Sequence, residues 1–162
     1  MNSPLSNQSF YALNQGKYLS EMFCLPKGEA TIYVSTHLEI GDSDLLHYHD
    51  QPHLTFIVNG GMIDKRKTVE NERLSGELMF FHAGEPHQTI SKVFPTKYVS
   101  LQFQSDFFQQ NSCLESALKS SIEKTPTAKF LLLRIYKELT INDEFSSNSL
   151  EMLLLNLITS EN

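Results

Sequence analysis

The sequence predicts a mainly-β domain, a closed barrel or sandwich of short strands, followed by a short C-terminal α-helical segment. Up to about residue 106, short β-rich runs alternate with turn residues and no helical pattern separates them. Beyond that point the apolar residues recur at helical spacing. The 162 residues suit a single domain that buries its own core.

The expected strands are apolar, β-branched runs bounded by glycine, proline and asparagine. They cover residues 31–40, 53–58, 62–69, 77–82 and 97–104. Asn59-Gly60-Gly61 follows the second run and is a strong hairpin signal, so we expect the chain to reverse there. In the last run polar and apolar residues alternate, which predicts two faces of different polarity.

The helical tail is expected to hold three helices. The first covers 112–124, Thr125 caps the second with Pro126 at its first position, and the third covers 150–158. We therefore divide the chain into a barrel (1–108) and a tail (109–162). We predict homodimerisation through tail leucines, with packing of these leucines against the barrel as the alternative. The leucines are Leu132, Leu139, Leu153 and Leu154.

Composition narrows the functional classes. The formal net charge is −6, from 13 Lys and Arg against 19 Asp and Glu, which argues against direct contact with a phosphate backbone. Cys24 and Cys113 lie too far apart in sequence for a CxxC pair, and we expect both to be reduced. No signal peptide and no apolar run of membrane-spanning length is visible, so we expect a cytoplasmic protein.

Four histidines carry the expected chemistry. His47 and His49 are separated by one residue, which on an extended segment directs both imidazoles to the same side. His53 follows a turn at residues 50–52, and His87 follows a second turn at 83–86. Because imidazole is a common ligand for transition metals, the spacing predicts a site for Zn, Ni or Fe. The alternative is that these rings satisfy buried hydrogen bonds or line a pocket without metal.

The two histidine segments resemble the two cupin motifs. Gly41, His47, His49 and Gly60 match the first motif, and Gly76, Gly84 and His87 match the second. The resemblance implies a cupin double-stranded β-barrel, or jelly roll. The chain departs from the motifs where His53 replaces a glutamate, His82 a proline and Ser91 an asparagine. A four-histidine site without a carboxylate is atypical of cupin enzymes, and we therefore expect no enzymatic activity.

A narrower resemblance covers about residues 30–160. The phrases HYHDQPHLTFIVNGG, FFHAGEPHQ and YVSLQF are similar to the N-terminal sensor domains of AraC-type bacterial transcription regulators. This implies an effector-sensing and dimerisation domain, in which DNA is contacted only through a C-terminal domain that this chain does not contain. A small-molecule effector would be bound in the barrel between the four histidines and a set of wall residues. The expected wall residues are Thr55, Ile57, Phe81, Leu101 and Phe103.

Other functions remain open from the sequence. A stand-alone cupin metalloprotein or metalloenzyme, of the dioxygenase or sugar isomerase type, would use the same histidines with one open coordination position. A structural or sugar-binding cupin would need neither a metal nor a DNA-binding partner domain.

Overall fold

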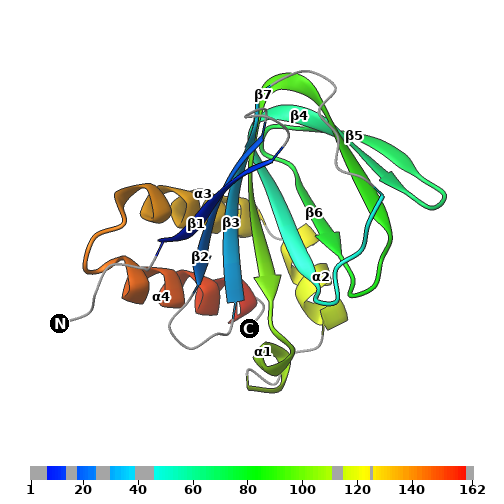
Figure 1. Cartoon of the computed structure of the whole chain (residues 1–162). Helices are drawn as coiled ribbons and strands as arrows, with labels where there is room; N and C mark the ends of the chain where they lie inside the picture. Colours follow the sequence, from blue (N-terminus) through cyan, green and yellow to red (C-terminus); the bar gives the residue numbers. More distant parts are fainter. Residues whose placement is uncertain are drawn as a thin grey trace.

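The computed structural model describes residues 7–13, 18–24, 30–38, 46–110, 115–124 and 126–159. The strands are β1 (Asn7–Leu13), β2 (Tyr18–Cys24), β3 (Ala30–His37), β4 (His53–Arg66), β5 (Glu70–Leu74), β6 (Leu78–Phe81) and β7 (His87–Phe103) (Figure 1). The helices are α1 (Ser105–Gln110), α2 (Glu115–Lys124), α3 (Pro126–Ile141) and α4 (Ser146–Thr159). The predicted order of a β domain followed by a helical tail is confirmed.

The strands form one antiparallel sheet. Its order is β1-β2-β3-β7-β4-β5, and β6 pairs with β4 beside this path. The long strands β4 and β7 bend, so that the sheet curls into a barrel (Figure 1). Helices α3 and α4 lie on one flank of the sheet, and α2 lies near β6 (Figure 1). None of the described helices is long and apolar enough to span a membrane.

The two faces of the sheet have different neighbours. Leu54 and Phe56 of β4 lie on the face that packs against the helices, in one large apolar core with tail residues such as Leu132 and Leu157. Ile57 of β4 and Phe81 of β6 lie on the opposite face, in a smaller cluster with three further residues from the same strands and β7. We call these the helix-covered face and the inner face. The main hydrophobic core therefore lies between sheet and helices, outside the barrel.

The expected hairpin at Asn59-Gly60-Gly61 is wrong. Strand β4 continues through these residues, and its register with β7 shifts between Ile57 and Met62. Gly60 has a φ of +81°, and a Cβ there would lie 2.5 Å from the carbonyl oxygen of Val93 and 2.6 Å from that of Pro95. The glycines thus form a bulge where two strands approach closely, because only glycine tolerates both this φ and this contact.

Other differences follow from signals that are weak in the sequence. Strands β1 and β2 were not expected, and neither was the first half of β7, which follows directly on the turn before His87. Helix α4 begins at Ser146 instead of residue 150. At this start, the Ser146 hydroxyl accepts a hydrogen bond from the Asp143 amide at 2.9 Å. Residues 112–114 and Thr125 lie outside the described residues, and the domain boundary at 108 stays a prediction.

Candidate metal centre

Backbone pairing brings the histidine segments together at one end of the barrel. His47 and His87 form an antiparallel bridge: each amide donates to the other's carbonyl oxygen, at 3.0 and 2.8 Å. The amide of Gly84 donates to the carbonyl of His49 at 2.8 Å. His53 begins β4 and His87 begins β7, at opposite ends of the antiparallel β4–β7 pairing, yet their ring centroids lie 5.2 Å apart.

The side chains of His47, His49 and His87 form a compact cluster, which we call the histidine triad. One ring nitrogen of each lies within 4.8 Å of those of the other two. The Nε2 atoms of His47 and His49 are only 3.1 Å apart. Ring centroids are 4.5 Å apart between His47 and His87 and 5.3 Å apart between His49 and His87. His87 is buried and the other two are half-buried, so the cluster faces solvent on one side only.

His53 lies beside the triad as a fourth ring. Its centroid is 4.3 Å from that of His49 and 5.2 Å from that of His87. The ring also stacks on Phe81, with centroids 4.6 Å apart and an interplanar angle of 13°. Burial, together with the neighbouring imidazoles of His49, His87 and His47, lowers the pKa of His53 to about 2. His53 is therefore neutral at physiological pH, and its Nδ1 has no hydrogen-bond partner among the described residues.

The tautomer of His87 follows from its hydrogen bond. Nδ1 of His87 lies 2.9 Å from the carbonyl oxygen of Glu85, which can only accept, so Nδ1 carries the proton. The lone pair of His87 is then on Nε2. Burial lowers the pKa of His87, although the hydrogen bond to Glu85 opposes this effect. A neutral ring held by a backbone carbonyl is the usual state of a metal-ligating histidine.

Arg66 connects the residues around His87 through hydrogen bonds and a ring contact. It is the direct cross-strand partner of His87, and its Nε donates to both carboxylate oxygens of the fully buried Asp64, at 3.1 and 3.3 Å. Its Nη1 donates to Glu85 at 2.8 Å, and its guanidinium lies 4.4 Å from the ring centroid of Phe81. The Arg66 guanidinium and the His82 amide together lower the pKa of Glu85, against the effect of its partial burial. The turn before His87 is thereby anchored to β4.

These residues fit a divalent transition metal. The three imidazoles of the triad supply nitrogen donors of the kind that Zn, Ni and Fe accept. Two Nε2 atoms at 3.1 Å would repel each other through their lone pairs unless a proton or a cation lies between them. The triad can therefore hold a metal through three nitrogens, which leaves coordination positions for another ligand.

Not all of the expected wall residues share the inner face. Thr55, Ile57 and Phe81 lie there, but Leu101 and Phe103 are fully buried in the core under the helices. The correction follows from strand alternation, since Leu101 and Phe103 have the opposite parity to the inner-face residues of β7. Further polar residues of the inner face are absent from the expected wall, although the alternation in KYVSLQFQ indicates two of them. These residues are Ser35, His37, Tyr98 and Ser100.

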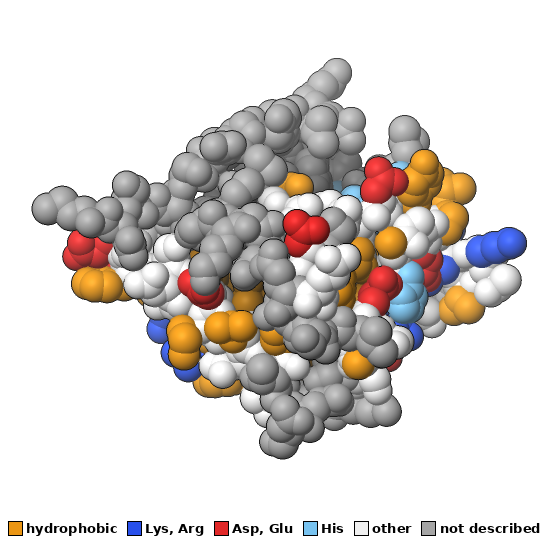
Figure 2. All heavy atoms as spheres, turned by 90° about the horizontal axis from the view of Figure 1, so that it is seen from below, with side chains coloured by type: hydrophobic (Ala, Val, Ile, Leu, Met, Phe, Trp, Pro, Cys, Tyr) orange, Lys and Arg blue, Asp and Glu red, His pale blue; other side chains and the backbone are white. Residues whose placement is uncertain are grey.

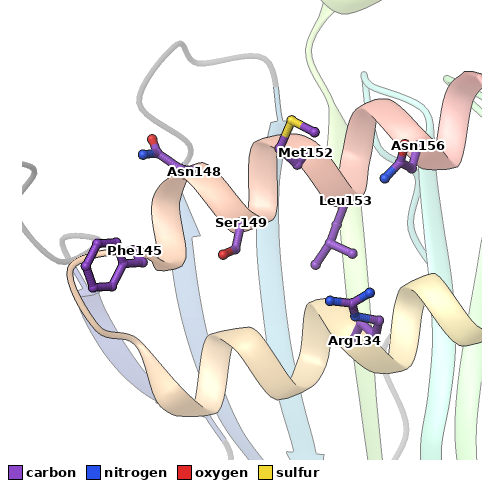
Figure 3. A pocket seen from close by; sticks show the side chains of 7 residues that line it. All are labelled: Arg134, Phe145, Asn148, Ser149, Met152, Leu153 and Asn156. Carbon is purple, nitrogen blue, oxygen red and sulfur yellow. The ribbon is translucent and has the colours of Figure 1, made fainter.

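The four tail leucines expected at a dimer interface are buried within the chain. Leu132, Leu139, Leu153 and Leu154 are each at most 6% exposed and belong to the core between helices and sheet. The alternative, packing against the barrel, is what the structure shows. The exposed apolar side chains of the tail are others, including Phe130, Phe145 and Met152. Figure 3 shows the shallow groove between α3 and α4 that Phe145 and Met152 help to line.

Among the described residues on the face seen in Figure 2, Lys and Arg side chains do not gather into a patch. Lys and Arg side chains lie near opposite ends of the described surface, with acidic and apolar side chains between them. This distribution agrees with the low fraction of basic residues in the sequence.

Comparison with known proteins identifies the fold through solved structures. No family model and no curated protein matches the chain. Among solved structures, KdgF from Halomonas sp. matches with a TM-score of 0.54 and 10% identity over 65% of this chain and 97% of its own. An RmlC-like cupin from Shewanella frigidimarina matches with a TM-score of 0.52 and 12% identity, covering 67% and 99%. FeII HppE matches with a TM-score of 0.50 and 14% identity, covering 59% and 56%.

The barrel is a cupin fold with C-terminal helices, as the motif resemblance implied. The prediction that the chain is not an enzyme is wrong as it stands, because enzymes such as HppE and KdgF share this fold. Replacement of the motif glutamate by His53 therefore does not exclude catalysis.

Proposed function

We propose that this cupin domain binds a divalent transition metal at the histidine triad and a small-molecule effector in the barrel. We further propose that it acts as the effector-sensing and dimerisation domain of an AraC-like regulator. The observation that carries the proposal is the convergence of three imidazoles at the end of a barrel whose inner face carries several buried polar side chains.

The polarity of the inner face supports an effector site. Thr55 Oγ1 and Ser100 Oγ lie 2.8 Å apart, and His37 Nε2 lies 3.1 Å from the hydroxyl of Tyr98. Ser35, His37 and Thr55 are nearly completely buried. On the helix-covered face, the same strands contribute buried apolar residues such as Ile32, Phe56 and Leu101 to the large core. Since buried polar groups contribute less to stability than apolar ones, their concentration on one face favours a binding role.

The metal would be held by Nε2 of His87 and by the ring nitrogens of His47 and His49. When bound, it would supply Lewis acidity and an anchoring point for an oxygen or nitrogen atom of the effector. His53 contributes a neutral ring beside the cluster, and Phe81 forms an apolar wall behind it. The chain's own residues thus provide an apolar side, a hydrogen-bonding side and the triad.

Two measurements test this proposal. The purified chain is loaded with Co²⁺ or Zn²⁺, and metal content is compared with that of a His47→Ala/His49→Ala variant and of a control variant, Lys92→Ala, at an exposed residue outside the site. We expect about one metal per chain in the wild type and the control, and none in the double variant. Equal metal content in all three would refute the site. For the regulatory role, the coding sequence after residue 162 should encode two helix-turn-helix units with a basic balance.

The second candidate is a cupin metalloenzyme. It is favoured by the half-exposed side of the triad, which leaves room for a substrate, and by the likeness to FeII HppE. Turnover of a small organic substrate by the Fe²⁺-loaded chain, abolished in the His47→Ala/His49→Ala variant, would favour the enzyme over the sensor.

A further inference from the structure

The turn between β6 and β7, residues 82–87, ends at His87 of the triad. It also contacts the segment that carries the other two triad residues, His47 and His49. Its Gly84 amide donates to the carbonyl of His49, and His87 exchanges backbone hydrogen bonds with His47. Within the turn, the Glu85 amide donates to the carbonyl of His82 at 3.1 Å. A change in the separation of the triad residues is therefore transmitted directly to the backbone of this turn.

The same turn touches the helical tail. Nδ1 of His82 lies 2.5 Å from Oε1 of Glu115, the first residue of α2. The backbone amide of His82 donates to Oε2 of Glu85 at 2.9 Å, and Glu85 in turn binds Arg66 on β4. His82 thus has its side chain on the tail and its backbone in the network that orients His87.

Among the described residues, few other tertiary contacts hold helix α2 against the rest of the chain. It is a short helix whose described buried side chains are Leu118 and Ile122, both in the core that also contains α4. Isolated helices of this length are marginal in water, so α2 depends on its tertiary contacts. The contact between His82 and Glu115 lies at its first turn, where loss of a partner leads most readily to fraying.

We propose that the His82–Glu115 contact couples occupancy of the histidine triad to the docking of α2 on the barrel. The coupling rests on the proposed function only in that a metal must bind at the triad. Metal binding holds His47, His49 and His87 together and so restrains the turn, and a restrained turn presents His82 to Glu115 in one position. By thermodynamic linkage, the docked helix in return favours metal binding by the same factor.

The magnitude of the coupling is limited by solvent. The side chains of His82 and Glu115 are 45% and 31% exposed, and partly exposed polar contacts of this kind change equilibria by up to about fivefold. We therefore expect about a threefold effect on metal affinity. By linkage, the same factor applies to the local opening of α2, which hydrogen exchange measures at the helix itself.

The experiment compares the whole chain in four forms: wild type, Glu115→Gln, His82→Ala, and Glu123→Gln as the matched control. Glu123 is on the same helix but pairs with Lys119 of α2 itself. Co²⁺ affinity is measured by chelator competition, and hydrogen exchange of α2 amides is followed with and without Co²⁺. Zinc is used in a repeat to show that the effect does not depend on one metal.

In the wild type and in Glu123→Gln, we expect Co²⁺ to slow exchange in α2 severalfold. In Glu115→Gln and His82→Ala, we expect that slowing to be absent and Co²⁺ to bind about threefold more weakly. Tight Co²⁺ binding with no change in α2 exchange in the wild type would overturn the coupling while leaving the metal site intact. Unchanged slowing in Glu115→Gln would assign the coupling to the apolar contacts instead. Absence of Co²⁺ binding to the wild type would overturn both proposals.

Discussion

His53 lies flat against Phe81, with ring centroids 4.6 Å apart and planes inclined by 13°. The ring also lies close to the imidazoles of His49 and His87, with centroids 4.3 and 5.2 Å away. The ring is only 6% exposed, so protonation would place a charge in an apolar and electropositive position. This relationship explains why the pKa of His53 falls to about 2.

The first prediction is acid destabilisation of the metal-free chain. The folded state keeps His53 neutral down to a pKa of about 2, whereas the unfolded chain takes up a proton near 6.5. Below pH 6.5 the unfolded state therefore binds more protons, and the free energy of unfolding falls as pH falls. For this single group the slope approaches about 1.4 kcal/mol per pH unit well below 6.5.

Urea unfolding at pH 7, 6 and 5 in the presence of a chelator measures this slope. His53→Phe is the matched variant, because it keeps a ring against Phe81 and cannot be protonated. We expect a shallower slope in His53→Phe, and an unchanged slope would show that other groups cause the acid sensitivity.

The second prediction separates a three-histidine site from a four-histidine site. His53 lies outside the triad, so His53→Gln should weaken Zn²⁺ binding by at most about 10- to 100-fold, the range for a residue that only supports a ligand. Loss of a direct ligand in His49→Ala should weaken it by more than about 100-fold. Chelator competition at pH 7 gives both affinities. Equal losses in the two variants would make His53 a fourth ligand.

The third prediction concerns the bulge in β4. Gly60→Ala should destabilise the chain by about 3 kcal/mol, because it adds a left-handed residue and a Cβ that collides with two carbonyl oxygens. Gly76 has a similar φ of +83°, but a Cβ there meets nothing within 4 Å. Gly76→Ala should therefore cost only about 1 kcal/mol, the conformational penalty alone. Urea unfolding of both variants tests this, and equal losses would show that the close approach at Gly60 is absent.

The fourth prediction moves the expected homodimer contact to exposed residues. Phe145 and Met152 are 64% and 60% exposed beside the groove between α3 and α4, whereas the four leucines named from the sequence are buried. If the chain dimerises through its tail, Phe145→Glu or Met152→Glu should shift it towards monomer. Val69→Glu, at an exposed apolar site between β4 and β5, should leave the oligomeric state unchanged. Sedimentation velocity at several concentrations measures this, and a wild type that stays monomeric at high concentration would contradict the homodimer.

Histidine spacing and strand alternation made part of the site predictable. Two histidines one residue apart on extended backbone share a side, and this holds wherever the segment lies. The same parity argument assigns Thr55 and Ile57 to the face of His53. It also separates Leu101 and Phe103 from Ser100, so their inclusion among the wall residues was avoidable.

Other features depend on contacts between residues distant in sequence. Asn59-Gly60-Gly61 has the composition of a hairpin, yet the carbonyls of Val93 and Pro95 occupy the space beside it, and the strand passes through as a bulge. The helical spacing of Leu132 and Leu153 identifies an apolar stripe but not the surface that it covers. Here that surface is the outer face of the barrel.

The sequence by itself determined that strands precede helices, that His47 and His49 share a side, and that His53 and His87 follow turns that allow them to approach this pair. These properties arise from local periodicity and turn chemistry, which act within a few residues. Only the tertiary structure shows that His53 stacks on Phe81 beside His47, His49 and His87, that Thr55 meets Ser100, and that His82 meets Glu115. Such relations depend on strand register and on the bend of β4 and β7, which are set by packing across the whole chain and leave no local mark in the sequence.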